Sequence, residues 1–147
     1  MSFSSDATIH VEKEKREREY KELHDSPRSP FKGMHFWNIF ITAMAIGYHQ
    51  KVRAPLSGAR HDLFQPARTL GEKEEWLIRS IAVAEKGDVE ELIGKESEIL
   101  KTAEEYANGG IFFLYDSVFG GDPGDPVKKL ETIATDIYDR LGSREDL

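Results

Sequence analysis

Cysteine is absent from this 147-residue sequence, which excludes disulfide bonds and thiolate chemistry. An apolar run of membrane-spanning length is absent too. The longest run, Phe36–Tyr48, has 13 residues and includes Asn38 and Thr42, whereas a transmembrane helix needs about 20 apolar residues. The N-terminal segment shows no apolar region of a secretory signal. These absences predict a cytoplasmic protein without a membrane contact.

Motifs of catalytic and cofactor-binding sites are absent as well. The five histidines include no pair three or four residues apart, although a zinc site needs clustered ligands. The segment GDPGDP lacks the terminal glutamate of a calcium loop and the lysine of a phosphate loop. No serine stands in a nucleophile-elbow pattern. We predict no catalytic residue, no metal site and no cofactor, and an enzymatic activity has no residue-level support.

The net charge of -7 is distributed unevenly along the chain. Residues 1–27 have a net charge of -2 and residues 69–147 have -10, whereas residues 28–68 carry six bases against one acid, Asp62. A basic segment within an acidic protein is suited to binding a polyanion locally. The same cations can instead pair with acids of the chain itself, and the sequence leaves both interpretations open.

Length and hydrophobic periodicity predict an all-α fold, a single compact domain of about six helices with a long basic loop. We assign residues 11–142 to this domain, residues 1–10 to a disordered N-terminus, and residues 143–147 to a frayed C-terminus. Helices are expected at residues 12–23, 36–48, 69–86, 89–107, 111–119 and 126–141.

Local signals set the expected helix ends. Thr69 and Glu72 fit a capping box that opens the 69–86 helix. Asn108-Gly109-Gly110 is expected to end the 89–107 helix, because glycine favours the backbone conformation that follows a helix. The adjacent acids Glu104 and Glu105 point in different directions on a helix and are expected to be solvated.

The best candidate for a functional site is the segment after the apolar helix, residues 49–68, which lacks periodicity and contains Pro55, Gly58 and Pro66. Loops this long in a small domain are usually functional or disordered. Lysine and arginine suit contacts with DNA phosphates, and glutamine and arginine can also read base edges. The predicted nucleic-acid-binding residues are Lys32, His49, Gln50, Lys51, Arg53, Arg60 and Arg68.

Three short segments resemble a known family. They read Ala43-x-x-x-Gly47-Tyr48, Lys51-x-Arg53-x-Pro55-Leu56 and Tyr106-Ala-Asn-Gly-Gly-Ile111. They are similar to small accessory proteins encoded beside DNA-phosphorothioation (dnd) gene clusters, over about residues 31–141. This resemblance implies a role in DNA sulphur modification or in the restriction that depends on it. It implies proteins of such a complex as partners and supplies no catalytic residue.

We therefore hypothesise a non-enzymatic accessory protein of a DNA modification or restriction system, which binds DNA or a DNA-processing partner through its basic loop. The alternative is a protein–protein adaptor that uses its acidic C-terminal half and makes no DNA contact. The charge-alternating helix near the N-terminus is compatible with packing on a second subunit, so the sequence also allows a homo-oligomer.

Overall fold

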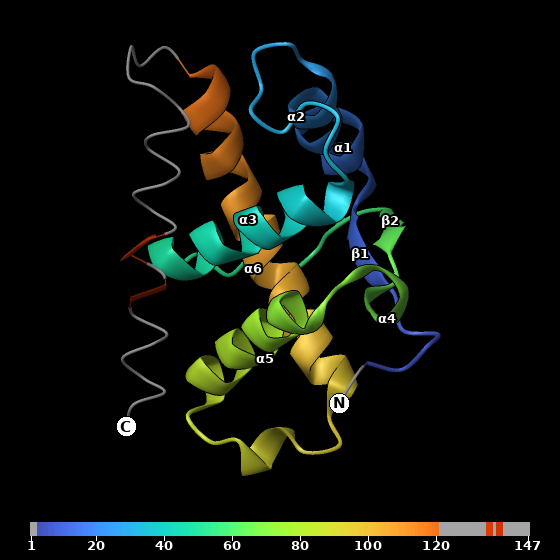
Figure 1. Ribbon diagram of the computed structural model, residues 1–147, viewed down its shortest axis with the longest axis vertical. Coiled ribbons are helices and arrows are strands. Elements are labelled where there is room, and N and C mark those ends of the chain that lie inside the picture. The colour runs from blue at the N-terminus through green and yellow to red at the C-terminus, as the bar shows by residue number, and fades with distance from the viewer. Residues whose placement is uncertain (1–2, 121–134, 137, 140–147) are drawn as a thin grey trace.

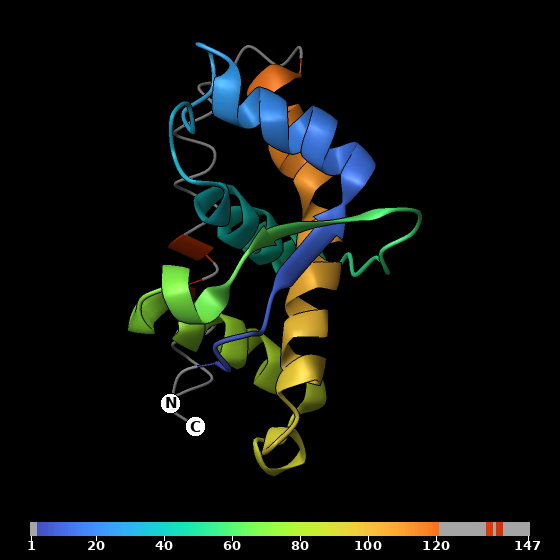
Figure 2. The ribbon, with the colours of Figure 1, turned by 90° about the vertical axis from the view of Figure 1, so that its right-hand side faces the viewer.

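The computed structural model describes residues 3–120, 135–136 and 138–139. In chain order its elements are β1 (Ile9–Glu12), α1 (Lys13–Lys15), η1 (Arg16–Tyr20), α2 (Lys21–Asp25), α3 (Phe36–Gln50), β2 (Arg60–Phe64), α4 (Pro66–Thr69), α5 (Glu72–Lys86), η2 (Glu90–Leu92) and α6 (Glu96–Phe119). The long helix α6 forms the axis of the domain (Figure 1). Helix α3 crosses it near its middle, and α5 packs beside its first half (Figures 1 and 2).

The core lies where these three helices meet. Its fully buried side chains come from every major element, and they include Ile9, Tyr20, Leu23, Ile39, Phe40, Met44, Ile78, Ile81, Ile111 and Leu114. The apolar run of α3 supplies several of them, which confirms the prediction of a buried helix there. None of the helices within the described residues is both long enough and apolar enough to cross a membrane.

A two-stranded antiparallel sheet makes the prediction of an all-helical fold correct only in part. His10 of β1 pairs with Asp62 of β2, and Glu12 pairs with Arg60. Ile9 is fully buried, and Phe3 is buried as well, although the sequence assigned both to a disordered N-terminus. Part of the segment 49–68, which was expected to be a loop, forms strand β2. The fold is therefore mainly helical, with a small sheet that joins the N-terminus to the basic segment.

The capping box predicted at Thr69 and Glu72 is wrong. Thr69 ends the short helix α4, and Gly71 precedes α5 without any side-chain hydrogen bond to the helix start. Pro66 explains the difference, because proline is favoured in the first turn of a helix and starts α4 here. The extended backbone of Leu70 then separates the two helices.

Two predicted helices, 89–107 and 111–119, are in fact one helix preceded by a short turn. Residues 90–92 form η2, and α6 then runs without interruption from Glu96 through Asn108-Gly109-Gly110 to Phe119. The glycines were interpreted as a helix end, which is wrong. They stand inside the helix because of the way α3 and the chain after it contact α6.

Glycine is required where α3 crosses α6. A Cβ atom on Gly110 would lie less than 3.0 Å from the carbonyl oxygen of Ala43, and one on Gly47 would lie equally close to the carbonyl oxygen of Tyr106. Real Cβ atoms essentially never approach so closely. The two helix backbones are therefore in direct contact, and each helix contributes a glycine to that contact.

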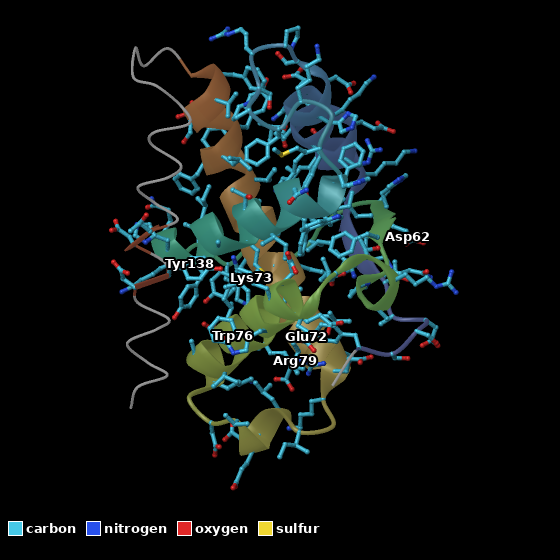
Figure 3. All side chains as sticks on the ribbon, viewed as in Figure 1. Asp62, Glu72, Lys73, Trp76, Arg79 and Tyr138 are labelled. Atoms are coloured by element: carbon cyan, nitrogen blue, oxygen red, sulfur yellow. The ribbon has the colours of Figure 1, made fainter. Side chains whose placement is uncertain are left out.

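The helix predicted at residues 126–141 and the frayed tail at 143–147 lie outside the described residues, apart from four positions of that helix. One of these, Tyr138, approaches α5 (Figure 3). The ammonium group of Lys73 lies 5.4 Å from the centroid of its ring. The Tyr138 hydroxyl raises the pKa of Lys73 by hydrogen bonding.

Replacement of Gly110 by alanine tests the crossing. Alanine in place of a helical glycine normally adds about 1 kcal/mol of stability. Here we expect the Gly110→Ala variant to lose about 3 kcal/mol, because the added methyl group forces the backbones of α3 and α6 apart. Chemical denaturation followed by circular dichroism measures this change.

Gly71→Ala is the matched control, since a Cβ there meets only the flexible end of the Glu74 side chain. We expect its stability to stay within about 0.5 kcal/mol of the wild type. An unchanged or increased stability of Gly110→Ala would contradict the close crossing.

Candidate nucleic-acid interface

The segment that follows α3 is bound to α6 through its own backbone. The Val52 amide donates to the carbonyl oxygen of Gly47, and the Ala54 amide donates to that of Glu105, at 2.9 and 3.1 Å. The Val52 carbonyl faces Gly109, where a Cβ would lie less than 3.0 Å from it. The first half of the predicted basic loop is therefore fixed on the surface of α6.

Asn108 connects this segment to the N-terminal strand. Its side-chain amide nitrogen lies 3.1 Å from the carbonyl oxygen of Ala54 and 2.9 Å from Oε2 of Glu12. The same Glu12 oxygen accepts the amide of Ser57 at 2.9 Å. Lys15 donates to Asn108 Oδ1 at 2.8 Å. The asparagine thus satisfies polar groups from two other parts of the chain, the N-terminal segment 12–15 and the segment after α3.

Glu12 is held in its ionised form by these contacts. Burial alone would raise its pKa, but the hydrogen bonds from the Ser57 amide and the Asn108 side chain, together with the charge of Lys15, lower the pKa overall. The carboxylate therefore acts as the acceptor that holds residue 57 against β1.

Arg53, one of the predicted DNA-binding residues, is neutralised by acids of the chain. Its Nε lies 2.7 Å from Glu105 Oε1, and its Nη1 lies 3.0 Å from Glu85 Oε1. The side chain is 29% exposed, and that of Glu105 is 10% exposed. Arg53 therefore joins the segment after α3 to α5 and α6, and its charge is matched internally, as the self-pairing interpretation anticipated.

Tyr106 completes this group of side chains. Its hydroxyl donates a hydrogen bond to Glu85. That bond is the largest cause of the lowered pKa of Glu85, and Arg53 lowers it further against the effect of burial. Burial and the bond to Glu85 raise the pKa of Tyr106 to about 12. The contacts describe a structural network, with no nucleophile or free base among them.

A second polar group connects the sheet to α6. The His10 ring lies between Asp62, at 3.1 Å from Nε2, and Glu104, at 3.1 Å from Nδ1. Asp62 is on the outer surface of the sheet (Figure 3) and its side chain is 77% exposed. Glu104 is buried, and burial raises its pKa. Among the described residues, no group of three or more histidine and acidic side chains is arranged to hold a metal ion.

Five of the seven predicted residues have exposed side chains: Lys32, Gln50, Lys51, Arg60 and Arg68. Within the described part of the chain, none of the four cations among them forms an ion pair. The sixth, His49, is half-buried, and its Nδ1 has no hydrogen-bond partner among the residues that the structure describes.

These exposed cations do not form one cluster. Helix α3 has 15 residues and is about 22 Å long. It begins beside the sheet, where Phe40 packs on Phe64, and ends across α6 from the sheet (Figure 1). Lys51 therefore lies far from Arg60 and Arg68, and Lys32 stands in the connection between α2 and α3. The structure separates the predicted site into distinct places.

Sequence reasoning missed residues that position this region. Glu104 and Glu105 were expected to be solvated, which is wrong, because both residues are buried. Asn108 was interpreted as part of a helix end. A signal was available, because small residues recur along α6 at Ala103, Ala107 and Gly110 and mark a face that another backbone approaches.

Lys13 is a further exposed cation that the sequence did not single out. Its amide donates to the carbonyl oxygen of Ala59 at 2.8 Å, so it lies beside the beginning of β2. It was overlooked because it belongs to the charge-alternating helix.

The three segments that resemble dnd-associated proteins meet in this region: the end of α3, the chain after it, and the glycine-containing middle of α6. The model of the family described as DNA sulphur modification system-associated protein 4 matches residues 8–138. The chain belongs to this family, which confirms the resemblance. Neither a curated protein nor a solved structure matches the chain.

Arg53→Met tests the structural role of the arginine. The variant keeps most of the side-chain length but leaves the largely buried Glu105 without its partner. We expect a loss of about 2 kcal/mol in the free energy of unfolding, a value reduced for the partial exposure of the pair. Arg68→Met, at an exposed position, is the control and is expected to change stability by less than about 0.5 kcal/mol. Equal stability of the two variants would contradict the assignment.

Glu85 makes the free energy of unfolding depend on pH in a defined direction. Its pKa is lowered from 4.5 on folding, so its stabilising contribution is complete above that value and is lost as the pH falls through the lower, folded-state pKa. We expect the Glu85→Gln variant to lose less stability than the wild type on acidification below about pH 4.5. Urea denaturation at several pH values measures this difference. Glu72→Gln, on the same helix, is the control, and a parallel pH profile for Glu85→Gln and wild type would refute the prediction.

Proposed function

We propose that this protein is a non-enzymatic accessory component of a DNA sulphur modification system and contacts the phosphate backbone of DNA through exposed cations at its β1–β2 sheet. Arg60 at the start of β2 and Arg68 in α4 carry the proposal. Lys13 adds to them, because its amide donates to the carbonyl oxygen of Ala59, the residue before Arg60. The observation on which it rests is that Arg60 and Arg68 are exposed without an ion pair to any described acid.

The way in which the chain before Arg60 is attached to the rest of the domain supports the proposal. The Ser57 amide donates to Glu12, and the Asn108 side chain donates to the carbonyl oxygens of Ala54 and Pro55, which fixes the chain before Arg60. The pairing of Glu12 with Arg60 fixes the beginning of β2. Cations on a fixed backbone lose less conformational entropy on binding than cations on a flexible loop. The acidic remainder of the chain disfavours contact with DNA through other faces.

The proposed interface is smaller than the one that the sequence suggested. Arg53 is excluded from it because Glu85 and Glu105 engage its guanidinium group. Lys51 and Lys32 are exposed but stand in other parts of the fold. The proposal therefore makes Arg60 and Arg68 the principal phosphate ligands.

A salt titration of DNA binding tests this function. Each phosphate contact adds about 0.9 to the slope of log affinity against log salt concentration. We expect Arg60→Glu/Arg68→Glu to weaken binding to a labelled duplex and to reduce that slope by about two. Fluorescence anisotropy with plain and phosphorothioated duplexes, measured between low and physiological salt, gives both quantities.

Lys21→Glu/Lys101→Glu is the matched control. It makes the same change in net charge at two exposed positions, one on α2 and one on α6. We expect this control to bind with the wild-type salt slope. The proposal fails if the wild type does not bind DNA, or if both double variants lose affinity equally, since an equal loss reports only the overall charge.

A further inference from the structure

The turn between α5 and α6, residues 88–95, exposes two aliphatic side chains. Val89 is 59% exposed and Ile93 is 72% exposed. Both views place η2 at the lower end of the molecule, beyond the ends of α5 and α6 (Figures 1 and 2). Single exposed apolar residues are common, but two of them on one short projecting turn mark a surface that a partner can cover.

This turn has a defined shape. Leu92 is 5% exposed and anchors it in the core. The Leu92 amide donates to the carbonyl oxygen of Val89 at 3.0 Å, and the Glu90 amide donates to Asp88 Oδ1 at 2.9 Å. At its base, Lys86 and Glu98 join the two helices by an ion pair of 2.7 Å. The exposed side chains are therefore held on a folded scaffold.

Two glycines allow the chain to reverse at both ends of the turn. Gly87 has φ +80° and Gly94 has φ +76°, in the left-handed region that glycine adopts without strain. Nothing lies within 4 Å of a Cβ built at either position, so backbone conformation and not crowding accounts for glycine here. These residues direct the segment between them away from the helix ends.

The turn that carries the two aliphatic side chains has more acids than bases, three acids against Lys95. Asp88, Glu90 and Glu91 are exposed, and none of them forms an ion pair with a described residue. The net negative charge of the turn opposes contact with DNA or with an anionic lipid surface. Charge complementarity therefore favours a partner whose apolar hollow is bordered by lysine and arginine.

We propose that residues 88–95 form a docking element that places Val89 and Ile93 in a basic-rimmed apolar hollow of another protein of the same DNA sulphur modification system. The element is at a different place in the fold from Arg60 and Arg68, so this inference goes beyond the proposed DNA contact. With both surfaces in use, the protein joins DNA to a second component.

Binding to purified components tests the docking element. Each protein encoded with this chain in one dnd cluster is titrated individually against the full-length chain by biolayer interferometry. We expect one component to bind the wild type and to bind Val89→Ser/Ile93→Ser at least 30-fold more weakly. Asp88→Asn/Glu90→Gln/Glu91→Gln is expected to bind about tenfold more weakly at low salt and to show less salt dependence. Thermal unfolding verifies that each variant is folded.

Two controls make the outcome specific. Phe112→Ser removes an apolar side chain of α6 that is 58% exposed and is expected to bind the component as the wild type does. Arg60→Glu/Arg68→Glu is also expected to bind it normally, so failure of the DNA proposal leaves this one intact. The docking proposal is overturned if no component binds, if Val89→Ser/Ile93→Ser binds normally, or if Phe112→Ser loses as much. Loss of self-association alone in Val89→Ser/Ile93→Ser, measured by light scattering, also overturns it and assigns the turn to a homo-oligomer.

Discussion

Direct backbone contact between α3 and α6 is the constraint on which the rest of the structure depends. Gly47 and Gly110 allow the two helices to touch, and Gly109 admits the carbonyl group of Val52 immediately beside them. Each glycine within a helix costs about 1 kcal/mol relative to alanine. The buried side chains that this approach brings together, among them Phe40, Met44 and Ile111, offset the cost. Helix α6 therefore tolerates two adjacent glycines at the point where a helix would otherwise be expected to end.

The crossing also determines which charges remain available for binding. Once the chain after α3 lies against α6, its polar groups need partners, which Glu105 and Asn108 of α6 and Glu12 of β1 supply. The charge of Arg53 is neutralised in this way by Glu85 and Glu105. Arg60 lies beyond the last of these attachments and stays exposed. Glu104 and Glu105 of α6 are thus buried within the domain. The acids of the 88–95 turn are exposed, at a different place in the fold from Arg60.

The sequence was informative where hydrophobic or charge periodicity extended over a whole helix, and less so for helix ends, since the capping box at Thr69 and Glu72 is absent. The buried helix α3, the helix that begins at Lys13 and α5 follow from hydrophobic and charge periodicity, and the family resemblance follows from three short motifs. The other errors concern contacts between segments far apart in the sequence. Strands β1 and β2 come from distant segments, and neither shows its partner in its own pattern. Glycines 109 and 110 were interpreted by local propensity, although a tertiary contact decides their role. In the candidate site, periodicity could not show that Glu85 and Glu105 would neutralise Arg53, because that match exists only after α5 and α6 pack.

Amide hydrogen exchange measured residue by residue tests most directly whether the chain after α3 is part of the folded core. The account predicts that the amides of Val52, Ala54 and Ser57, which donate to Gly47, Glu105 and Glu12, exchange as slowly as amides in the middle of α6. Exchange at the rate of an unstructured loop, with α6 itself protected, would contradict it, because Arg60 would then be carried by a flexible segment and not by the α3–α6 contact.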